Sequence, residues 1–86
     1  MSGRWKSKKK PAALDARFNF DDFEVLRAFL DEVAEEAERL EHHPNISFAR
    51  DRVSIIIYST SEELSDIDHK LAKAIDDGYD KVMNLA

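Results

Sequence analysis

The stretch Asn45–Ser59, "NISFARDRVSIIIYS", holds two runs of strand-forming residues on either side of a short charged segment, Arg50-Asp51-Arg52. That segment predicts a tight turn, so the two runs are predicted to pair as an antiparallel hairpin. A strand that is apolar on both faces is predicted to be central in its sheet, or covered on its second face by another subunit. The second run has this character, with Val53, Ile55 and Ile57 on one face and Ile56 and Tyr58 on the other.

The segment upstream of the hairpin predicts one strand and one helix. Residues 14–20, "LDARFNF", alternate in polarity as a half-buried strand does. Either Asp21 or Asp22 can cap the helix that follows, and Pro44 restricts His43, so this helix is predicted to end at or before His42. Its apolar stripe recurs at three- and four-residue steps: Leu26, Phe29, Leu30, Val33, Ala37 and Leu40.

The segment downstream predicts a second helix. Ser65 and Asp68 have capping-box spacing at its start. Gly78 costs this helix about 1 kcal/mol relative to alanine, which weakens the prediction for the last turn. The order strand, helix, strand, strand, helix predicts an α+β fold class, with an antiparallel sheet and helices packed on one face. The inner face of the second helix carries Leu71, Ile75 and Val82.

The composition limits the classes of protein to which the chain can belong. Its 86 residues make one domain near the lower size limit for an independent core, so a homodimer or homotetramer that extends the sheet is expected. The chain has no cysteine, which excludes disulfides, thiolate metal sites and a cysteine nucleophile, and which fits a cytoplasmic location. No long apolar run predicts a membrane span, and no secretory signal is expected.

The net charge of −5 is distributed unevenly along the chain. The first ten residues carry five basic side chains and no acid, whereas the other 76 carry 8 basic and 18 acidic ones. A body this acidic disfavours binding to nucleic-acid phosphates. Residues 1–13 show no periodicity and are predicted to form a basic N-terminal arm ahead of a domain spanning 14–86. Trp5 in this arm is expected to pack on the parent domain or on a neighbouring subunit.

Residues 41–45, "EHHPN", place two of the three histidines side by side. They can be the polar end of a helix, where histidines meet the negative end of the helix dipole. A zinc site needs three or four convergent ligands, and only His69 and scattered carboxylates remain to complete one, so no metal is expected. The abundant serines and acids leave a Ser-His-Asp arrangement open, although no "GxSxG" segment is present. General acid or base work by a loop histidine is the remaining alternative.

Glu38, His42, His43 and Pro44 form the pattern E-x-x-x-H-H-P, and "LSDIDHKLAKAID" follows near the C-terminus. In these features and in its order of elements, the chain resembles the pterin-4a-carbinolamine dehydratase family, whose mammalian members are also dimerisation cofactors of a homeodomain transcription factor. The resemblance implies His42, His43 and Asp68 as candidate catalytic residues, acting on the 4a-carbinolamine of a tetrahydropterin. The tetrahydropterin would be the substrate, so no separate cofactor is implied.

Two positions depart from the family pattern. Arg50 stands where the family has an aromatic residue, and Thr60 stands where its third, catalytically important histidine belongs. Loss of one histidine from such a cluster removes a contribution of roughly 10²- to 10⁴-fold to the rate. Weak or absent dehydratase activity is therefore expected.

The front half of the chain is more similar to the dehydratase-like Rubisco assembly factors of α-carboxysomes. The shared features are a Trp-led basic arm, a proline before the first strand, and the motifs "RF-x-F", "R-x-FLD" and "P-x-ISF-x-R". This resemblance implies Trp5, Lys9, Arg50 and Arg52 as partner-binding residues, the Rubisco large subunit as a partner, and a location associated with the carboxysome. Two functions are expected as alternatives: an assembly factor with little or no catalytic activity, or an active 4a-hydroxytetrahydropterin dehydratase.

Overall fold

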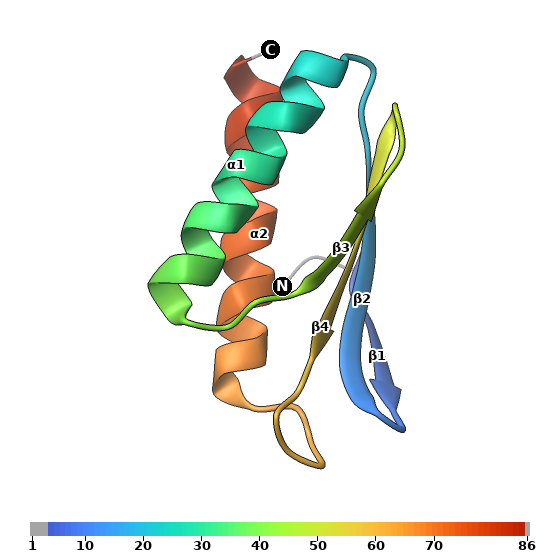
Figure 1. Ribbon diagram of the computed structural model, residues 1–86, viewed down its shortest axis with the longest axis vertical. Helices are drawn as coiled ribbons and strands as arrows, with labels where there is room; N and C mark the ends of the chain where they lie inside the picture. The colour runs from blue at the N-terminus through green and yellow to red at the C-terminus, as the bar shows by residue number, and fades with distance from the viewer. Residues whose placement is uncertain (1–3, 86) are drawn as a thin grey trace.

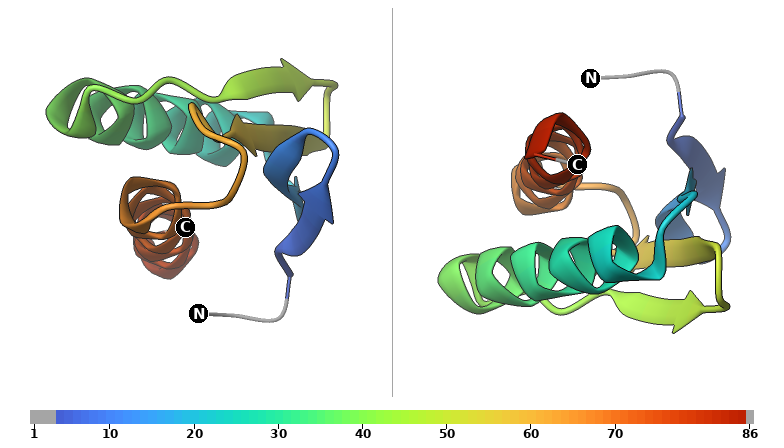
Figure 2. Two further views of the ribbon diagram at one scale, coloured as in Figure 1. Left: turned by 90° about the horizontal axis from the view of Figure 1, so that it is seen from below. Right: turned by 90° about the horizontal axis from the view of Figure 1, so that it is seen from above.

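The computed structural model describes residues 4–85 as two layers, an antiparallel four-stranded sheet and a pair of helices (Figure 1). Figure 2 shows both helices on the same side of the sheet. This arrangement confirms the α+β fold class predicted from the sequence. The elements, in chain order, are β1 (Lys6–Lys9), β2 (Ala12–Asn19), α1 (Phe23–Leu40), β3 (Asn45–Phe48), β4 (Arg52–Tyr58) and α2 (Asp66–Leu85).

The strand order is β1-β2-β4-β3, so β4 is central, as predicted. Residues directly opposite each other in neighbouring strands share a face of the sheet. Ile56 and Tyr58 lie on the face away from the helices, where Tyr58 is 41% exposed. The face that the helices cover carries three buried pairs from β2 and β4: Leu14 opposite Ile57, Ala16 opposite Ile55, and Phe18 opposite Val53.

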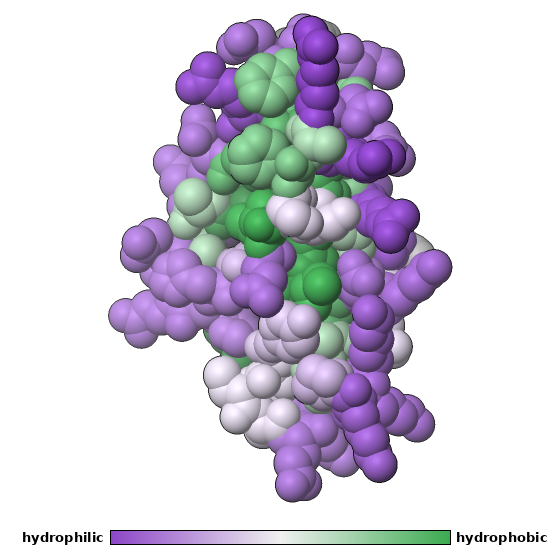
Figure 3. All heavy atoms as spheres, turned by 45° about the vertical axis from the view of Figure 1, so that its right-hand side comes forward, coloured by the Kyte–Doolittle hydropathy of each residue, from purple (hydrophilic) through white to green (hydrophobic). Residues whose placement is uncertain are grey.

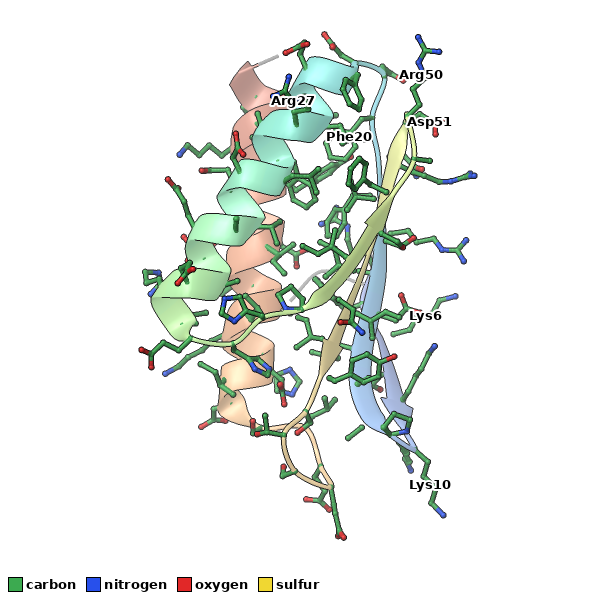
Figure 4. The ribbon with its side chains drawn as sticks, viewed as in Figure 1. Lys6, Lys10, Phe20, Arg27, Arg50 and Asp51 are labelled. Atoms are coloured by element: carbon green, nitrogen blue, oxygen red, sulfur yellow. The ribbon has the colours of Figure 1, made fainter. Side chains whose placement is uncertain are left out.

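Helix α1 begins after Asp22, whose side chain accepts a hydrogen bond from the Glu24 amide at 2.8 Å. Of the two capping candidates in the sequence, Asp22 is therefore the N-cap. Phe20, just before the helix, is 4% exposed and points between α1 and the sheet (Figure 4). The stripe that α1 turns toward the sheet buries Leu26, Phe29, Val33 and Ala37.

Two backbone hydrogen bonds close the C-terminal end of α1, which falls at Leu40 as predicted. The Glu41 amide donates to the Glu38 carbonyl at 3.2 Å, and the His42 amide donates to the Ala37 carbonyl at 3.1 Å. Glu41 adopts a left-handed conformation, with φ of 53°. This is the Schellman pattern, which reverses the chain and ties the backbone of His42 to the last turn of the helix.

Helix α2 continues without a break through Gly78. A Cβ atom added at Gly78 would lie 3.2 Å from the Cβ of Glu32 on α1. The missing side chain therefore allows the two helices to approach closely. This close approach explains why glycine is present here in spite of its low helix propensity. Within residues 4–85, neither helix is long and apolar enough to cross a membrane.

The N-terminal segment differs from the predicted arm, because β1 lies within it and pairs with β2 along its whole length. Trp5 is 7% exposed, packs edge-on against Phe18 and donates from Nε1 to the Asp76 carboxylate at 3.0 Å. The first long strand also begins at Ala12 and not at residue 14. Residues 4–13 are thus part of the folded sheet, and only residues 1–3 of the expected arm lie outside the described chain.

Candidate functional site

The end of α1 and the start of α2 bring His42 and Asp68 together. Nε2 of His42 lies 2.6 Å from Oδ1 of Asp68, a short hydrogen-bond distance. The side chain of Asp68 has no exposed surface, and that of His42 is 10% exposed. Two of the three candidate catalytic residues therefore form one buried pair.

Ser65 supplies the other hydrogen bonds of Asp68. Its backbone amide donates to Oδ2 of Asp68 at 2.9 Å, and its hydroxyl donates to the same oxygen at 3.1 Å. Ser65 was predicted as the first residue of a capping box, but its part in holding this carboxylate was not recognised. The hydrogen bonds from Ser65 that form the start of α2 therefore also orient the Asp68 carboxylate toward His42.

These contacts determine the charge of Asp68. Burial by itself raises the pKa of a carboxyl group, but hydrogen bonds from the Ser65 amide, from His42 and from the Ser65 hydroxyl outweigh it, and the pKa of Asp68 is lowered. Asp68 is therefore an ionised acceptor at neutral pH, and Nε2 of His42 carries the proton of their hydrogen bond. Nδ1 of the imidazole is left for a second partner.

A histidine held by a buried carboxylate can act as a general acid or base, because imidazole titrates near neutral pH. The arrangement does not form a serine nucleophile, since the Ser65 hydroxyl donates to Asp68 and no described serine is hydrogen-bonded to His42. The described chain also contains no group of three or more His, Asp or Glu side chains placed to hold a metal ion. His69 is exposed on α2.

The remaining members of the expected site stand apart from this pair. His43 is exposed beside it, and Thr60 is exposed in the loop that joins β4 to α2. The hydroxyls of Ser59 and Ser61 both donate to the Glu63 carbonyl, at 2.6 and 2.8 Å, and so close this loop on itself. The structure thus joins His42 to Asp68, and a threonine occupies the position where a third histidine was sought.

The four candidate partner-binding residues do not share one surface. Trp5 is a core residue of this chain, which corrects its assignment as a partner contact. Lys9 lies at the end of β1, next to Lys10, whereas Arg50 and Arg52 lie at the turn between β3 and β4. Figure 4 places Lys10 and Arg50 at opposite ends of the molecule, whose long dimension is 38 Å.

Two shallow hollows border the turn between β3 and β4, and each contains one exposed aromatic ring. Phe23, at the start of α1, is 43% exposed and lines the first hollow together with Arg50. Phe48, at the end of β3, is 58% exposed and lines the second together with Arg52. Figure 3 shows a band of exposed apolar side chains between charged ones on one face of the molecule. Neither ring was singled out from the sequence, because aromatic residues in such elements are usually core residues.

Sequence comparison places the chain among pterin-4a-carbinolamine dehydratases. The chain matches the family model for pterin 4 alpha carbinolamine dehydratase over residues 2–78. A protein provisionally named pterin-4-alpha-carbinolamine dehydratase from Synechococcus sp. (strain WH7803) is 42% identical over 66 residues, which are 73% of this chain and 69% of the relative. A protein of the same provisional name from Rhodospirillum rubrum is 40% identical over 73 residues, 84% of this chain and 76% of the relative.

Two solved structures share the fold. A pterin dehydratase-like protein identified as a Rubisco assembly factor in the alpha-carboxysome superposes with a TM-score of 0.80 and 32% identity, covering 87% of this chain and 88% of that one. A transcriptional coactivator/pterin dehydratase from Brucella melitensis superposes with a TM-score of 0.81 and 27% identity, covering 90% and 83%. With the family match over residues 2–78, these likenesses lead to one conclusion: the chain belongs to the pterin-4a-carbinolamine dehydratase family.

Proposed function

We propose that this member of the family is a binding protein with little or no dehydratase activity, which assists the assembly of Rubisco in association with the carboxysome. The observation that carries the proposal is that His42 pairs with Asp68 alone, while Thr60 stands in the sequence where the family resemblance leads us to expect a third histidine. The likeness to the solved assembly factor supports the choice of partner, since it extends over most of both chains.

The hollow beside the turn between β3 and β4 is the proposed contact surface for Rubisco. It combines the exposed ring of Phe23 with the guanidinium of Arg50, and Arg52 lies next to it. Three carboxylates line the same hollow: those of Asp21, Asp22 and Asp51. Aromatic residues and arginine are the side chains most enriched in protein interfaces and their energetic centres. In this proposal Arg50 and Arg52 keep the partner-binding role expected from the sequence, and Phe23 takes the place of Trp5.

The free edge of β3 supports a homodimer. All four residues of this edge strand are exposed, and Ile46 and Phe48 point to the same side as the core residues opposite them, Ile55 and Val53. An exposed apolar edge favours pairing with another strand. Antiparallel pairing of two β3 strands would continue the sheet into a second copy and cover Ile46 and Phe48.

Co-expression with the Rubisco large subunit tests the proposal, with the yield of assembled Rubisco as the measurement. The full chain is expected to raise the yield, and Arg50→Glu is expected to lose most of the increase because it replaces the guanidinium of the proposed contact with a carboxylate. His42→Ala is expected to keep the increase, since the pair of His42 and Asp68 takes no part in the proposed assembly contact. Lys70→Glu, which makes the same charge change on α2, is the matched control. Equal yields with and without the chain would overturn the proposal.

An active dehydratase is the alternative, and the contact between His42 and Asp68 favours it. In such an enzyme, His42 would protonate the departing 4a-hydroxyl group of the tetrahydropterin, and Asp68 would hold the imidazole in place. His43 would bind the pterin or take the proton from its N5. The chain retains His42, His43 and Asp68, which are the groups that these roles need. A high rate of dehydration would therefore favour the enzyme, and a low rate would favour the binding protein.

A further inference from the structure

Strand β1 leaves one edge of the sheet open. It pairs with β2 on one side, and no strand within residues 4–85 pairs with it on the other. An edge strand directs about half of its backbone N–H and C=O groups outward, away from its neighbour. All four residues of β1 are exposed, so an extended chain can reach these groups.

The side chains of this edge are mostly cationic. Lys6 and Lys8 point to the outer face of the sheet, away from the helices, and Lys9 lies on the alternate face. Figure 4 shows Lys6 and Lys10 extending away from the sheet. Within the described chain, the one ion pair of these lysines joins Lys8 to Asp15 at 3.3 Å, with the Lys8 side chain 56% exposed and the Asp15 side chain 28% exposed. Glu62 and Glu63 line a hollow together with Lys9 and Lys10, so the positive charge that the chain leaves available to a partner lies mainly at Lys6 and Lys8, on the outer face.

A hollow of about 300 Å³ continues the cationic row past the end of β1, and three of the five residues that line it are basic. Arg17 points to the same outer face as Lys6, because it is two residues from Asp15, which lies opposite Lys6. Arg4 is held in place by Asp76 at 2.6 Å. The full lining is Arg4, Lys6, Asp15, Ala16 and Arg17.

We propose that the outer edge of β1 is a strand-addition site for an extended acidic segment of a partner protein. The added backbone would pair with the outward N–H and C=O groups of β1. Because side chains alternate along a strand, acidic residues at every second position would face Lys6 and Lys8, and the next one along would enter the hollow beside Arg17. The lysines repel a second copy of β1, so this edge selects a partner of opposite charge.

This site rests on the proposed function only in that the chain acts by binding another protein. It is separate from the hollow at Phe23 and Arg50, because the two hollows share no lining residue. In a dimer paired through β3, both β1 strands would remain at the outer edges of the joined sheet. Each dimer would then present two equivalent sites, and a partner with two acidic segments would bind both with a gain in effective concentration.

The test titrates the full chain, labelled with nitrogen-15, with a synthetic peptide that has glutamate at alternate positions and valine or threonine between them. The amide resonances of Lys6–Lys9 and Arg17 are expected to shift most. The double variant Lys6→Glu/Lys8→Glu is expected to bind the peptide about 10-fold more weakly. The matched double variant Lys70→Glu/Lys73→Glu, on α2, is expected to bind within about 2-fold of the wild type. The amide spectrum of each variant verifies its fold.

A second peptide, N-methylated on the alternate backbone amides that would face β1, separates strand addition from simple charge attraction because it lacks the donors that the pairing uses. It is expected to lose binding. Equal binding of the two peptides, amide shifts spread evenly over the molecule, or equal weakening by the α2 double variant would each overturn the strand-addition site. Peptide binding at β1 in a chain that does not raise the yield of Rubisco would overturn the proposed function and leave this site standing.

Discussion

At the scale of single residues, one buried carboxylate organises the candidate site. Asp68 accepts the Ser65 amide, and so closes the capping box of α2, while its other oxygen holds His42. The helix therefore needs this carboxylate whether or not the site turns over a substrate. For this reason the contact between His42 and Asp68 is compatible with both functions, and Thr60 is the residue that distinguishes them.

The lowered pKa of Asp68 predicts how stability depends on pH. The folded chain binds this proton less readily than the unfolded chain, whose aspartates titrate near pH 4, so Asp68 stabilises the fold above that pH. Asp68→Asn is expected to lower the free energy of unfolding by about 2 kcal/mol at pH 7. The difference from the wild type should shrink as the pH falls below about 4, where the wild-type carboxylate gains its proton. Urea unfolding at a series of pH values measures both effects.

Asp77→Asn is the matched control for this prediction. Asp77 pairs with Lys73 at 3.0 Å on the surface of α2, with both side chains well exposed. Its substitution is expected to change the free energy of unfolding by less than about 0.5 kcal/mol. Equal effects of the two substitutions, or a loss in Asp68→Asn that persists undiminished at acid pH, would show that Asp68 is not held as an ionised acceptor.

At the scale of elements, β1 is fastened to the molecule by the two residues before it. Arg4 and Trp5 both donate to the Asp76 carboxylate on α2, at 2.6 and 3.0 Å. The guanidinium of Arg4 also lies over the rings of Phe18 and Tyr79, 4.9 Å from each centroid. The sheet edge thus depends on contacts with the last helix of the chain, more than 70 residues away in sequence.

Trp5→Ala tests whether β1 is docked in this way. Removing a buried tryptophan from a core is expected to cost about 3 kcal/mol, and the loss also leaves Asp76 one donor short. Lys9→Ala, an exposed position on the same edge, is expected to cost less than about 0.5 kcal/mol. Thermal unfolding of the two variants gives the comparison. Equal midpoints would mean that β1 is an undocked arm in solution.

The elements differ in how far the sequence predicts them, for physical reasons. The central strand and the end of α1 are as predicted. Of the predicted capping box, the hydrogen bond from the Ser65 amide to Asp68 is present, whereas the Ser65 hydroxyl donates to the same carboxylate and does not accept from the Asp68 amide. β1 was missed because its exposed side chains have no alternation of polarity, and its anchor is a contact between distant segments. The pairing of His42 with Asp68 was foreseeable only as far as the family resemblance implied it, since no spacing rule relates the end of one helix to the start of another.

At the scale of the whole molecule, the proposed homodimer predicts a change of mass. Phe48→Lys places a charge on the apolar edge of β3, so sedimentation is expected to show a monomer at concentrations where the wild type is a dimer. Met83→Lys, on the exposed side of α2, makes the same kind of change at a 39% exposed residue and is expected to remain a dimer. A dimer that survives Phe48→Lys but not Met83→Lys would place the interface on the helices.

We propose that the chain retains the pair of His42 and Asp68 but acts through separate binding surfaces, and the rate of dehydration of a 4a-hydroxytetrahydropterin tests this most directly. We predict that the wild type accelerates the reaction by less than about 10-fold and that His42→Ala does not lower the rate further. Thr60→His, which supplies the histidine expected at this position, is expected to raise the rate by up to roughly 10²-fold. Rapid turnover by the wild type that falls by roughly 10²-fold or more in His42→Ala would contradict the claim and establish the chain as a dehydratase.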